Sequence, residues 1–431
     1  MIKNPQKAKA ILTESEKNII DNTIAYIKDH KYQIRQHYLS VKSKKGQNKQ
    51  KDIFIKIDLD TYLSKLLDVS IVILTANYFE AAILNLNVYK ETNQKIYELD
   101  GGLELFRGSN ITEAYIMNWK SYTILHLHAP ETGSYTPCGS ADLVRYVNSC
   151  EYINPTCIIS FGICFGTDIG HYSLGDTIIG SKIYPWSIGV KINREDWKIK
   201  CDDYIIDLAE NAKKLYKKID TIVKETDKLC PQQKARLGHM ITSEAVLSSE
   251  QAKLEAIENA FTCKIVAGEM EGYGLAKEGL FYSSNAEMAC VILKAICDWG
   301  AIKNIDDYVK KEKNELVASY KDQLQAYTAF CAFKTLAVLF EEQVFSPDNI
   351  IRSLIIKLTE RYSLNNAIPM SCFCDYIEEY LEEENNMSYT GKYQLLAQAK
   401  RTKFVNIIKR KLLDEYLLYD PSKEMVVFYN T

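Results

Sequence analysis

The chain has 431 residues, with 53 Lys and Arg against 56 Asp and Glu, and its formal net charge is −3. This near-neutral balance gives no overall field that would recruit nucleic acid or an anionic membrane, so partners of that kind are not expected. The length is sufficient for two or three domains. The 12 cysteines are scattered along the chain, as reduced thiols of a cytoplasmic protein are.

No membrane segment is predicted. The first twenty residues lack the apolar core of a signal peptide. The longest apolar stretch, Leu324 to Phe340, contains Gln325 and Lys334 and has helical periodicity. It therefore predicts a packed amphipathic helix and not a membrane span. We expect a cytoplasmic protein.

Residues 1–67 are expected to form a helical N-terminal extension. Isoleucines at 19, 20, 24 and 27 repeat at helical spacing and predict one helix with an apolar face. The basic run from Lys42 to Lys51 is polar throughout and favours a solvated loop, with a contact to phosphates as the alternative.

Residues 68–344 alternate strand and helix signals, which predicts the α/β class: a mixed, mostly parallel central sheet flanked by helices. The predicted strands are Ile71–Thr75, Thr123–His128, Cys157–Phe161, Asp176–Ser181, His239–Ser243, Lys264–Gly268 and Val291–Cys297. The predicted helices are Ser140–Cys150, Asp202–Lys218, Ser249–Asn259, Tyr273–Gly279 and Tyr320–Glu342.

Residues 345–431 are predicted to be a small separate unit, because Ser346-Pro347 breaks the preceding helix. Three helices and a terminal hairpin are expected there, in a winged-helix-like arrangement. The third helix is rich in Lys and Arg, which makes DNA binding an alternative. Glutamates at 378, 379 and 382–384 would repel a duplex, so an interaction module for a protein partner is favoured.

Carboxylates follow two short apolar runs. KIVAGEMEGYG (Lys264 to Gly274) contains Glu269 and Glu271, and VILKAICDWG (Val291 to Gly300) contains Asp298. Such runs are typical of buried strands, and the carboxyl ends of strands in an open α/β sheet are where ligands bind. Because burying unpaired carboxylates is costly, we expect these three side chains to converge on one pocket.

Two further segments also read as strands that end at candidate site residues. Ser70 to Leu84 is a strand that runs into a helix, with Glu80 just past the turn. Ile158 to Thr167 is a strand followed by a glycine turn, in which Gly162 and Gly166 would let the backbone approach a ligand closely.

Taken together, these segments resemble the nucleoside phosphorylase/nucleosidase superfamily, which includes purine nucleoside phosphorylases, AMP nucleosidase and methylthioadenosine/S-adenosylhomocysteine nucleosidase. The resemblance covers roughly Leu67 to Glu342, and GHMITSEAV (Gly238 to Val246) stands where the family has its base-site strand. It implies a purine nucleoside or nucleotide as substrate, no cofactor and no metal, and assembly into a homo-oligomer. Similar fused architectures resemble bacterial antiviral effectors, some of which degrade ATP.

The resemblance also implies a role for each site residue. Asp298 would be the general acid toward the purine N7, and burial is expected to raise its pKa. Glu271 would bind the ribose hydroxyls, Met270 would pack against the sugar, and Glu80 would position water. Glu269 matches an acidic position beside the ribose. The remaining expected substrate contacts are Gly162, Ile163, Cys164 and Val246.

Hydrolysis is favoured over phosphorolysis, because the segment from Thr75 to Glu80 has a carboxylate and no arginine where phosphorylases bind phosphate. A phosphorylase and a non-catalytic nucleoside sensor remain the alternatives. The sequence departs from the family at Ile163-Cys164-Phe165-Gly166, which is bulkier than the usual small residues. The expected base-stacking aromatic near Val246 is missing, and the substitutes considered are Tyr184, Trp186 and Phe161.

Other functions of these residues are weaker alternatives. Glu271 and Asp298 could belong to a buried ion pair or a helix cap. Cys164 or Cys297 could be a nucleophile, although no histidine is near in the sequence, and packing is favoured. His126 and His128 could bind a metal, but no further ligand accompanies them at ligand spacing.

Overall fold

The computed structural model describes the greater part of the chain. The described ranges are 14–41, 53–105, 110–130, 132–168, 170–186, 204–225, 233–243, 264–281, 288–299, 305–306, 319–362, 367–384 and 392–427. Among the helices in these ranges, none has the length and apolar character needed to cross a bilayer.

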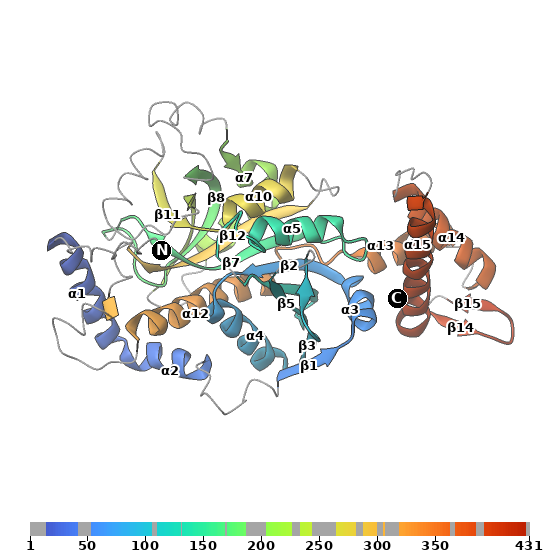
Figure 1. Cartoon of the computed structure of the whole chain (residues 1–431), viewed down its shortest axis with the longest axis horizontal. Coiled ribbons are helices and arrows are strands. Elements are labelled where there is room, and N and C mark those ends of the chain that lie inside the picture. Colours follow the sequence, from blue (N-terminus) through green and yellow to red (C-terminus); the bar gives the residue numbers. More distant parts are fainter. Residues whose placement is uncertain are drawn as a thin grey trace, which may run out of the picture.

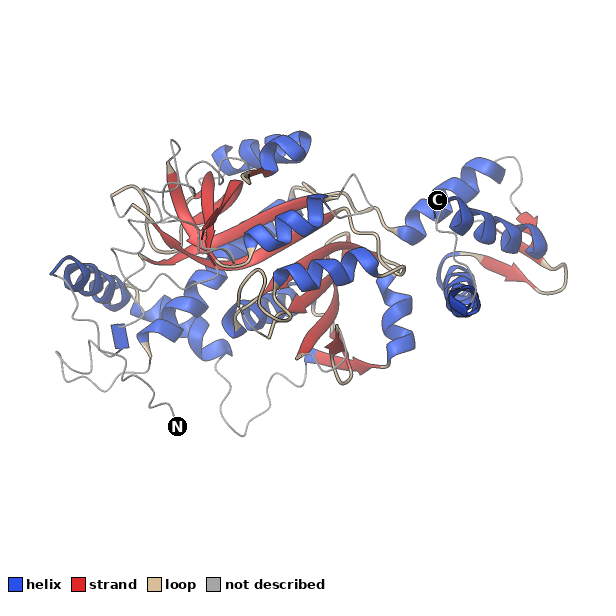
Figure 2. Ribbon diagram, turned by 45° about the horizontal axis from the view of Figure 1, so that its top comes forward, coloured by secondary structure: helices blue, strands red, loops and turns tan. Residues whose placement is uncertain are grey.

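A mixed sheet of twelve strands forms the centre of the molecule (Figures 1 and 2). Its main path runs β1-β3-β5-β6-β2-β7-β11-β10-β8-β12, with β4 paired to β5 and β9 paired to β8. The strands are β1 (Phe54–Ile57), β2 (Val69–Thr75), β3 (Ile96–Leu99), β4 (Leu103–Glu104), β5 (Ile111–Trp119), β6 (Tyr122–His128), β7 (Cys157–Gly166), β8 (Thr177–Trp186), β9 (Ile206–Asp207), β10 (Ala235–Ser243), β11 (Ile265–Glu269) and β12 (Ala289–Asp298).

The second half of this path closes on itself. Strand β12 pairs in parallel with β7 and also antiparallel with β8, so β7, β11, β10, β8 and β12 form a ring. These strands are apolar on both faces because one face lines the interior of the ring and the other is covered by helices. Strands β2, β7 and β12 run parallel, so their carboxyl ends meet at one edge.

Helices cover the sheet on both sides, as Figure 1 shows. Helices α4 (Tyr78–Thr92) and α12 (Tyr320–Glu341) contact each other on one side, and α5 (Ser140–Ser149) and α10 (Gly272–Phe281) contact each other on the other side. Helix α12 is buried along most of its length, and Trp119 packs between its Phe333 and Phe340 rings. The amphipathic helix predicted for this stretch is therefore confirmed, with a wide apolar face.

Two helices precede the sheet. The predicted isoleucine helix is α1 (Glu14–Asp29), and α2 (Lys31–Val41) follows it and packs against both α4 and α12. Strand β1 then joins the main sheet beside β3, and α3 (Leu59–Leu66) leads into β2. The sheet thus begins before residue 68, because the apolar residues of β1 pair with a strand that lies later in the chain.

The C-terminal residues form a unit with its own apolar core (Figure 2). It comprises α13 (Ile350–Tyr362), β13 (Ala367–Pro369), α14 (Met370–Glu384), α15 (Lys392–Lys411), a π-helical turn (Leu412–Tyr416), β14 (Leu418–Asp420) and β15 (Met425–Val427). The three predicted helices and the hairpin are present, and β13 adds a third strand. The winged-helix-like classification stays a prediction.

Every strand predicted in the central region is found, usually one to five residues longer. The predicted helix Asp202–Lys218 is wrong in its bounds. The chain there forms β9, then a short helix α7 (Leu208–Asn211) and α8 (Lys213–Glu225), because Asp207 caps a new helix start by accepting the N–H of Glu210. The predicted helix Ser249–Asn259 lies outside the described residues.

Candidate active site

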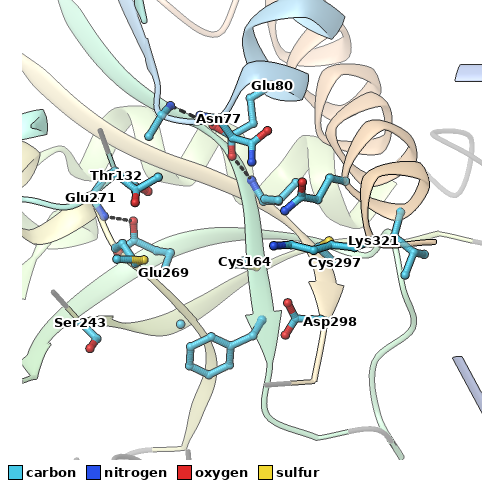
Figure 3. A pocket seen from close by; sticks show the side chains of 17 residues that line it. Asn77, Glu80, Thr132, Cys164, Ser243, Glu269, Glu271, Cys297, Asp298 and Lys321 are labelled. Carbon is cyan, nitrogen blue, oxygen red and sulfur yellow. Dashed lines mark hydrogen bonds between the residues drawn. The ribbon is translucent and has the colours of Figure 1, made fainter. Parts of the chain in front are cut away.

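A pocket of about 310 Å³ lies where β2, β7, β11 and β12 end (Figure 3). Its volume is at the lower end of the range for small-molecule sites. The residues that line it come from seven segments that are separate in the sequence. They are Ala76, Asn77, Glu80, Thr132, Ile163, Cys164, Phe165, Ser243, Gly268, Glu269, Met270, Glu271, Cys297, Asp298, Lys321, Leu324 and Gln325.

Glu80 is held at the start of α4, with its carboxylate turned into the fold. Its Oε2 accepts the backbone N–H groups of Ala76 and Asn77 at 3.0 Å each, and its Oε1 accepts the N–H of Ile163 at 2.9 Å. The side chain of Asn77 accepts from Phe79, which completes a capping box for α4. Burial raises the pKa of Glu80, while the charge of Lys294 opposes that rise. The carboxylate is therefore fixed in position at the pocket wall.

Gly162 makes room for this carboxylate. A Cβ at Gly162 would lie 2.0 Å from Oε1 of Glu80, and the residue has a φ of +154°. Only glycine can therefore stand at this position while Glu80 keeps its place. Gly162 itself supports the pocket from behind and is not part of its lining.

The turn after β11 carries three consecutive site residues. The carboxylate of Glu269 accepts the N–H groups of Glu271 and Gly272 at 2.8 and 2.7 Å and a hydrogen bond from the Thr242 hydroxyl. Burial, followed by the charge of Glu271, raises the pKa of Glu269 to about 7. Glu269 thus caps α10 and fixes the turn.

Two serines, one in the loop before α5 and one at the first residue of α5, hold the backbone of the same turn. The hydroxyl of Ser134 donates to the carbonyl of Met270 at 3.1 Å, and that of Ser140 donates to the carbonyl of Glu271 at 2.6 Å. The two backbone groups are therefore anchored independently of the Glu269 carboxylate.

Glu271 forms a buried ion pair with Lys294. The Nζ of Lys294 lies 3.0 Å from Oε2 of Glu271, and the Lys294 side chain is 1% exposed. Burial alone would lower the pKa of Lys294, but Glu271, Glu80 and Glu269 together raise it. Lys294 is paired with Gly162 in the register of β12 and β7, so its ammonium group lies among the three carboxylates and stays charged.

Asp298 ends β12 and is half-buried in the pocket. The register between β12 and β7 shifts between Ile296 and Asp298. This irregularity lets the consecutive residues Cys297 and Asp298 both line the pocket, although side chains normally alternate along a strand. Figure 3 shows the Asp298 carboxylate on the opposite side of the pocket from Glu80.

The two cysteines of the pocket are suited to packing. Burial raises the pKa of the Cys164 thiol and of the Cys297 thiol, and the charge of Asp298 adds to both shifts. Both are therefore held as neutral thiols, which supports the interpretation as packing residues.

Aromatic and cationic side chains complete the walls. Phe165 lies against Gly268, where a Cβ would come within 2.1 Å of its ring. Lys321, Leu324 and Gln325 reach the pocket from the first two turns of α12. The aromatic substitutes considered from the sequence were wrong for this pocket: Phe161 and Tyr184 are fully buried in the sheet, and neither they nor Trp186 lines it.

Most of the predicted site residues are brought together here. Glu80, Asp298 and the Glu269–Glu271 turn line the pocket with Ile163 and Cys164, while Val246 lies outside the described residues. Sequence reasoning missed Lys294, Phe165 and Lys321. Lys294 had a detectable signal, since a lysine inside an apolar strand requires a buried counter-charge. Lys321 had no such signal in the sequence, because its position at the pocket depends on how α12 packs.

The two histidines at the end of β6 are engaged in a hydrogen-bonded chain. The hydroxyl of Thr75 contacts Nε2 of His126 at 2.9 Å and Nδ1 of His128 at 3.0 Å, and Nδ1 of His126 contacts Oδ1 of Asn85 at 2.8 Å. Burial lowers the pKa of both histidines. In the described part of the chain, no group of three His, Cys, Asp or Glu is arranged to hold a metal ion.

No protein-family model matches the chain, and no curated protein matches it. Solved structures do. The chain is similar to 5′-methylthioadenosine/S-adenosylhomocysteine nucleosidase from Neisseria meningitidis, with 14% identity and a TM-score of 0.42 over 63% of this chain and 99% of that one. It is also similar to S-adenosylhomocysteine nucleosidase from Streptococcus pyogenes, with 15% identity and a TM-score of 0.46 over 64% and 97%.

A third similar structure is futalosine hydrolase from Helicobacter pylori, with 13% identity and a TM-score of 0.45 over 64% of this chain and 98% of that chain. The likeness to nucleosidases expected from the motifs is thus found among solved structures as well. In all three comparisons it spans nearly the whole of the other protein and about two thirds of this chain.

Proposed function

We propose that the protein is a nucleosidase that hydrolyses the N-glycosidic bond of a purine nucleoside or nucleotide. The observation that carries this proposal is that three of the four carboxylates that line the pocket are each held differently. Glu80 is fixed by backbone N–H groups, Glu271 is paired with Lys294, and Asp298 is half-buried at the end of a strand. Cleavage of a glycosidic bond requires protonation of the base, binding of the sugar and activation of water, and we assign one of these tasks to each of the three carboxylates.

Asp298 is proposed as the general acid. Cleavage leaves electrons on the purine, so the base departs most easily when its N7 receives a proton. A half-buried carboxyl group at the pocket wall can supply that proton if it is kept protonated near neutral pH. Phe165, which is paired with Asp298 in the register of β7 and β12, offers an apolar ring surface in the pocket, against which a purine could stack.

Glu271 and Glu80 are proposed to act on the sugar side. The ribose develops oxocarbenium character as the bond to the base lengthens. Lys294 engages Oε2 of Glu271, and Oε1 accepts no hydrogen bond among the described residues, so it can accept ribose hydroxyls. Glu80 orients a water molecule toward the anomeric carbon and takes its proton, since its raised pKa makes it a better base.

Hydrolysis suits this pocket better than phosphorolysis. Among the pocket-lining residues that the structure describes there is no arginine, and Glu80 stands beside the expected position of the nucleophile. A carboxylate there repels phosphate dianion but can activate neutral water. The pocket therefore favours water as the second reactant.

A direct test is chromatographic detection of free base after incubation with adenosine, methylthioadenosine, guanosine, AMP and ATP, each with and without phosphate. We expect release without phosphate, reduced about 10²- to 10⁴-fold by Asp298→Asn. Asp220→Asn, which changes an exposed carboxylate of α8, is the matched control and should be fully active. Unchanged release by Asp298→Asn would refute the assignment, and release only with phosphate would identify a phosphorylase.

The finer form of the proposal concerns substrate and setting. The sequence resemblance favours adenine as the base, and it favours ATP destruction in antiviral defence as the role. Assembly into a homo-oligomer and recruitment of a protein partner through the C-terminal unit belong to the same proposal. The ranking of the five substrates distinguishes salvage of nucleosides from destruction of ATP.

A further inference from the structure

A lysine reaches the pocket from the helix side. Lys321 lies in the first turn of α12, and Leu324 and Gln325 follow on the same helix face at spacings of three and four residues. Figure 3 shows the Lys321 side chain extending from the helix toward the pocket, with Asp298 nearby. Nothing in the mechanism proposed above uses this cation.

The charges of three pocket carboxylates are already compensated without Lys321. Glu80 and Glu269 accept backbone N–H groups, and Glu271 is paired with Lys294. Lys321 is the only cationic side chain among the described residues that line the pocket, and within the described ranges no ion pair involves it. Its charge opposes the burial effect on the pKa of Cys297, so its field acts on the pocket wall.

The start of α12 does not by itself supply an anion site. The hydroxyl of Ser319 donates to Asp306 at 2.6 Å, and the N–H of Tyr320 donates to the same carboxylate at 2.7 Å. The hydroxyl of Ser319 also accepts the N–H of Asp322 at 3.2 Å. The start of the helix is therefore capped by Ser319 and by Asp306, and any affinity for an anion must come from side chains.

We propose that Lys321, assisted by the amide of Gln325, binds a phosphate group in the active-site pocket. This inference rests on the proposed nucleosidase function and specifies its substrate class. An ammonium group provides three donors and a full charge, and an amide provides two more donors, which matches the acceptor-only surface of a phosphate. A partly buried cation is more effective than an exposed one, because water screens it less.

Two sources of phosphate have this chemistry: the phosphate of a purine nucleotide, and free inorganic phosphate. The nucleotide is favoured, because Glu80 would repel a free dianion placed to attack the sugar. A phosphate joined to the substrate can lie beside Lys321 and away from the reacting carbon. On this basis the protein discriminates nucleotides from nucleosides through Lys321.

The activity test compares Lys321→Ala, Lys321→Arg and Lys334→Ala on AMP, ATP and adenosine. Lys334 is an exposed lysine of the same helix, so its substitution removes an equal charge outside the pocket. We expect Lys321→Ala to lower kcat/KM for the nucleotides about 10- to 100-fold and to leave adenosine within about twofold. Lys321→Arg should recover part of the loss, and Lys334→Ala should have no effect.

A binding test separates this inference from the nucleosidase proposal. Calorimetric titration of AMP and adenosine into Asp298→Asn, with and without Lys321→Ala, reports on the phosphate contact even if no base is released. Weaker AMP binding with unchanged adenosine binding supports the inference. Inorganic phosphate is titrated in a third arm, and binding of phosphate that depends on Lys321 identifies the free anion as its ligand.

Two results would overturn the inference. An equal loss for nucleotides and adenosine would mean that Lys321 acts through Asp298 or through packing. No change for any ligand would mean that Lys321 makes no contact with substrate. Thermal unfolding of each variant checks that it is folded, and Lys321→Gln, which keeps most of the side-chain volume, replaces Lys321→Ala if that variant unfolds.

Discussion

The Nζ of Lys294 and Oε2 of Glu271 lie 3.0 Å apart in the interior of the molecule, and the side chains are 1% and 10% exposed. Lys294 lies in β12, and Glu271 lies in the turn after β11. These two strands are not neighbours in the sheet. The pair joins the proposed sugar-binding carboxylate to the centre of the fold. Geometry at the pocket therefore depends on an electrostatic contact beneath its surface.

Removing Lys294 should destabilise the protein strongly. In Lys294→Met, Glu271 keeps its place but loses its counter-charge, and an uncompensated buried charge costs about 3–5 kcal/mol. Chemical denaturation measures this loss. The double variant Lys294→Met/Glu271→Gln should regain part of it, since both charges are then absent. Lys224→Met, which breaks an exposed pair with Asp220, should change stability by less than about 1 kcal/mol.

Gly162→Ala should displace Glu80. The added methyl group would lie 2.0 Å from Oε1 of Glu80, so the carboxylate must leave its three backbone donors. We expect base release to fall at least about tenfold and the unfolding free energy to fall by about 1–3 kcal/mol. Gly101→Ala is the control, because Gly101 also has a positive φ but nothing lies within 4 Å of an added Cβ. Equal effects of the two substitutions would contradict the role given to Gly162.

Stability should depend on pH through Glu269. Burial and the charge of Glu271 raise its pKa from 4.5 to about 7 in the folded state. The folded protein therefore binds this proton more tightly than the unfolded chain does, and the stabilisation is complete below about pH 4.5 and is lost as the pH rises through about 7. Between pH 5 and pH 8, the unfolding free energy of the wild type should fall by roughly 2 kcal/mol relative to Glu269→Gln.

Glutamine is the informative replacement at this position because its carbonyl can still accept the N–H groups that cap α10. Denaturant unfolding of the two proteins at several pH values measures the difference between them. A difference that stays constant across this range would show that Glu269 keeps an ordinary pKa.

The C-terminal unit should depend on Asp68 for its attachment. Oδ2 of Asp68 lies 2.7 Å from the buried Nζ of Lys411, and its Oδ1 accepts the hydroxyl of Tyr416 at 3.0 Å. Asp68→Asn should lower the stability of the C-terminal unit by about 1–3 kcal/mol. Limited proteolysis should then cut faster near Ser346-Pro347. Asp60→Asn, which weakens the exposed pair with Lys403, should have little effect.

Much of the site could be predicted because the carboxylates follow apolar runs in the sequence, and the ends of buried strands are where ligands bind. An apolar run long enough for a buried strand ends at Glu269 in one case and at Asp298 in another. Strands β7 and β12 run parallel and end at one edge of the sheet, which places Asp298 there. Strand β11 runs antiparallel to β7, so the position of Glu269 in the same pocket depends on strand pairing and does not follow from this rule. Glu80 followed from the same logic, as the first acidic residue after the turn that leaves β2.

Three features could not be predicted because they depend on contacts between distant segments. Strand β12 closes a ring with β7 and β8, and a local pattern carries no information on which strands pair. Phe165 reaches the pocket where the sequence suggested other aromatic residues, because Gly268 on the adjacent strand leaves space for its ring. Strand β1 escaped prediction because its partner β3 lies some forty residues later.

The sequence by itself determined the α/β class, the strand positions and the set of carboxylates, since these follow from hydrophobic periodicity and from the cost of burying charge. Only the tertiary structure decided which charges neutralise one another. Lys294 belongs to an apolar segment in the sequence and Lys321 to a polar one, and the fold pairs Lys294 with Glu271 and brings Lys321 to the pocket. An electrostatic interaction depends on distance and burial, and both are fixed only when the segments pack together.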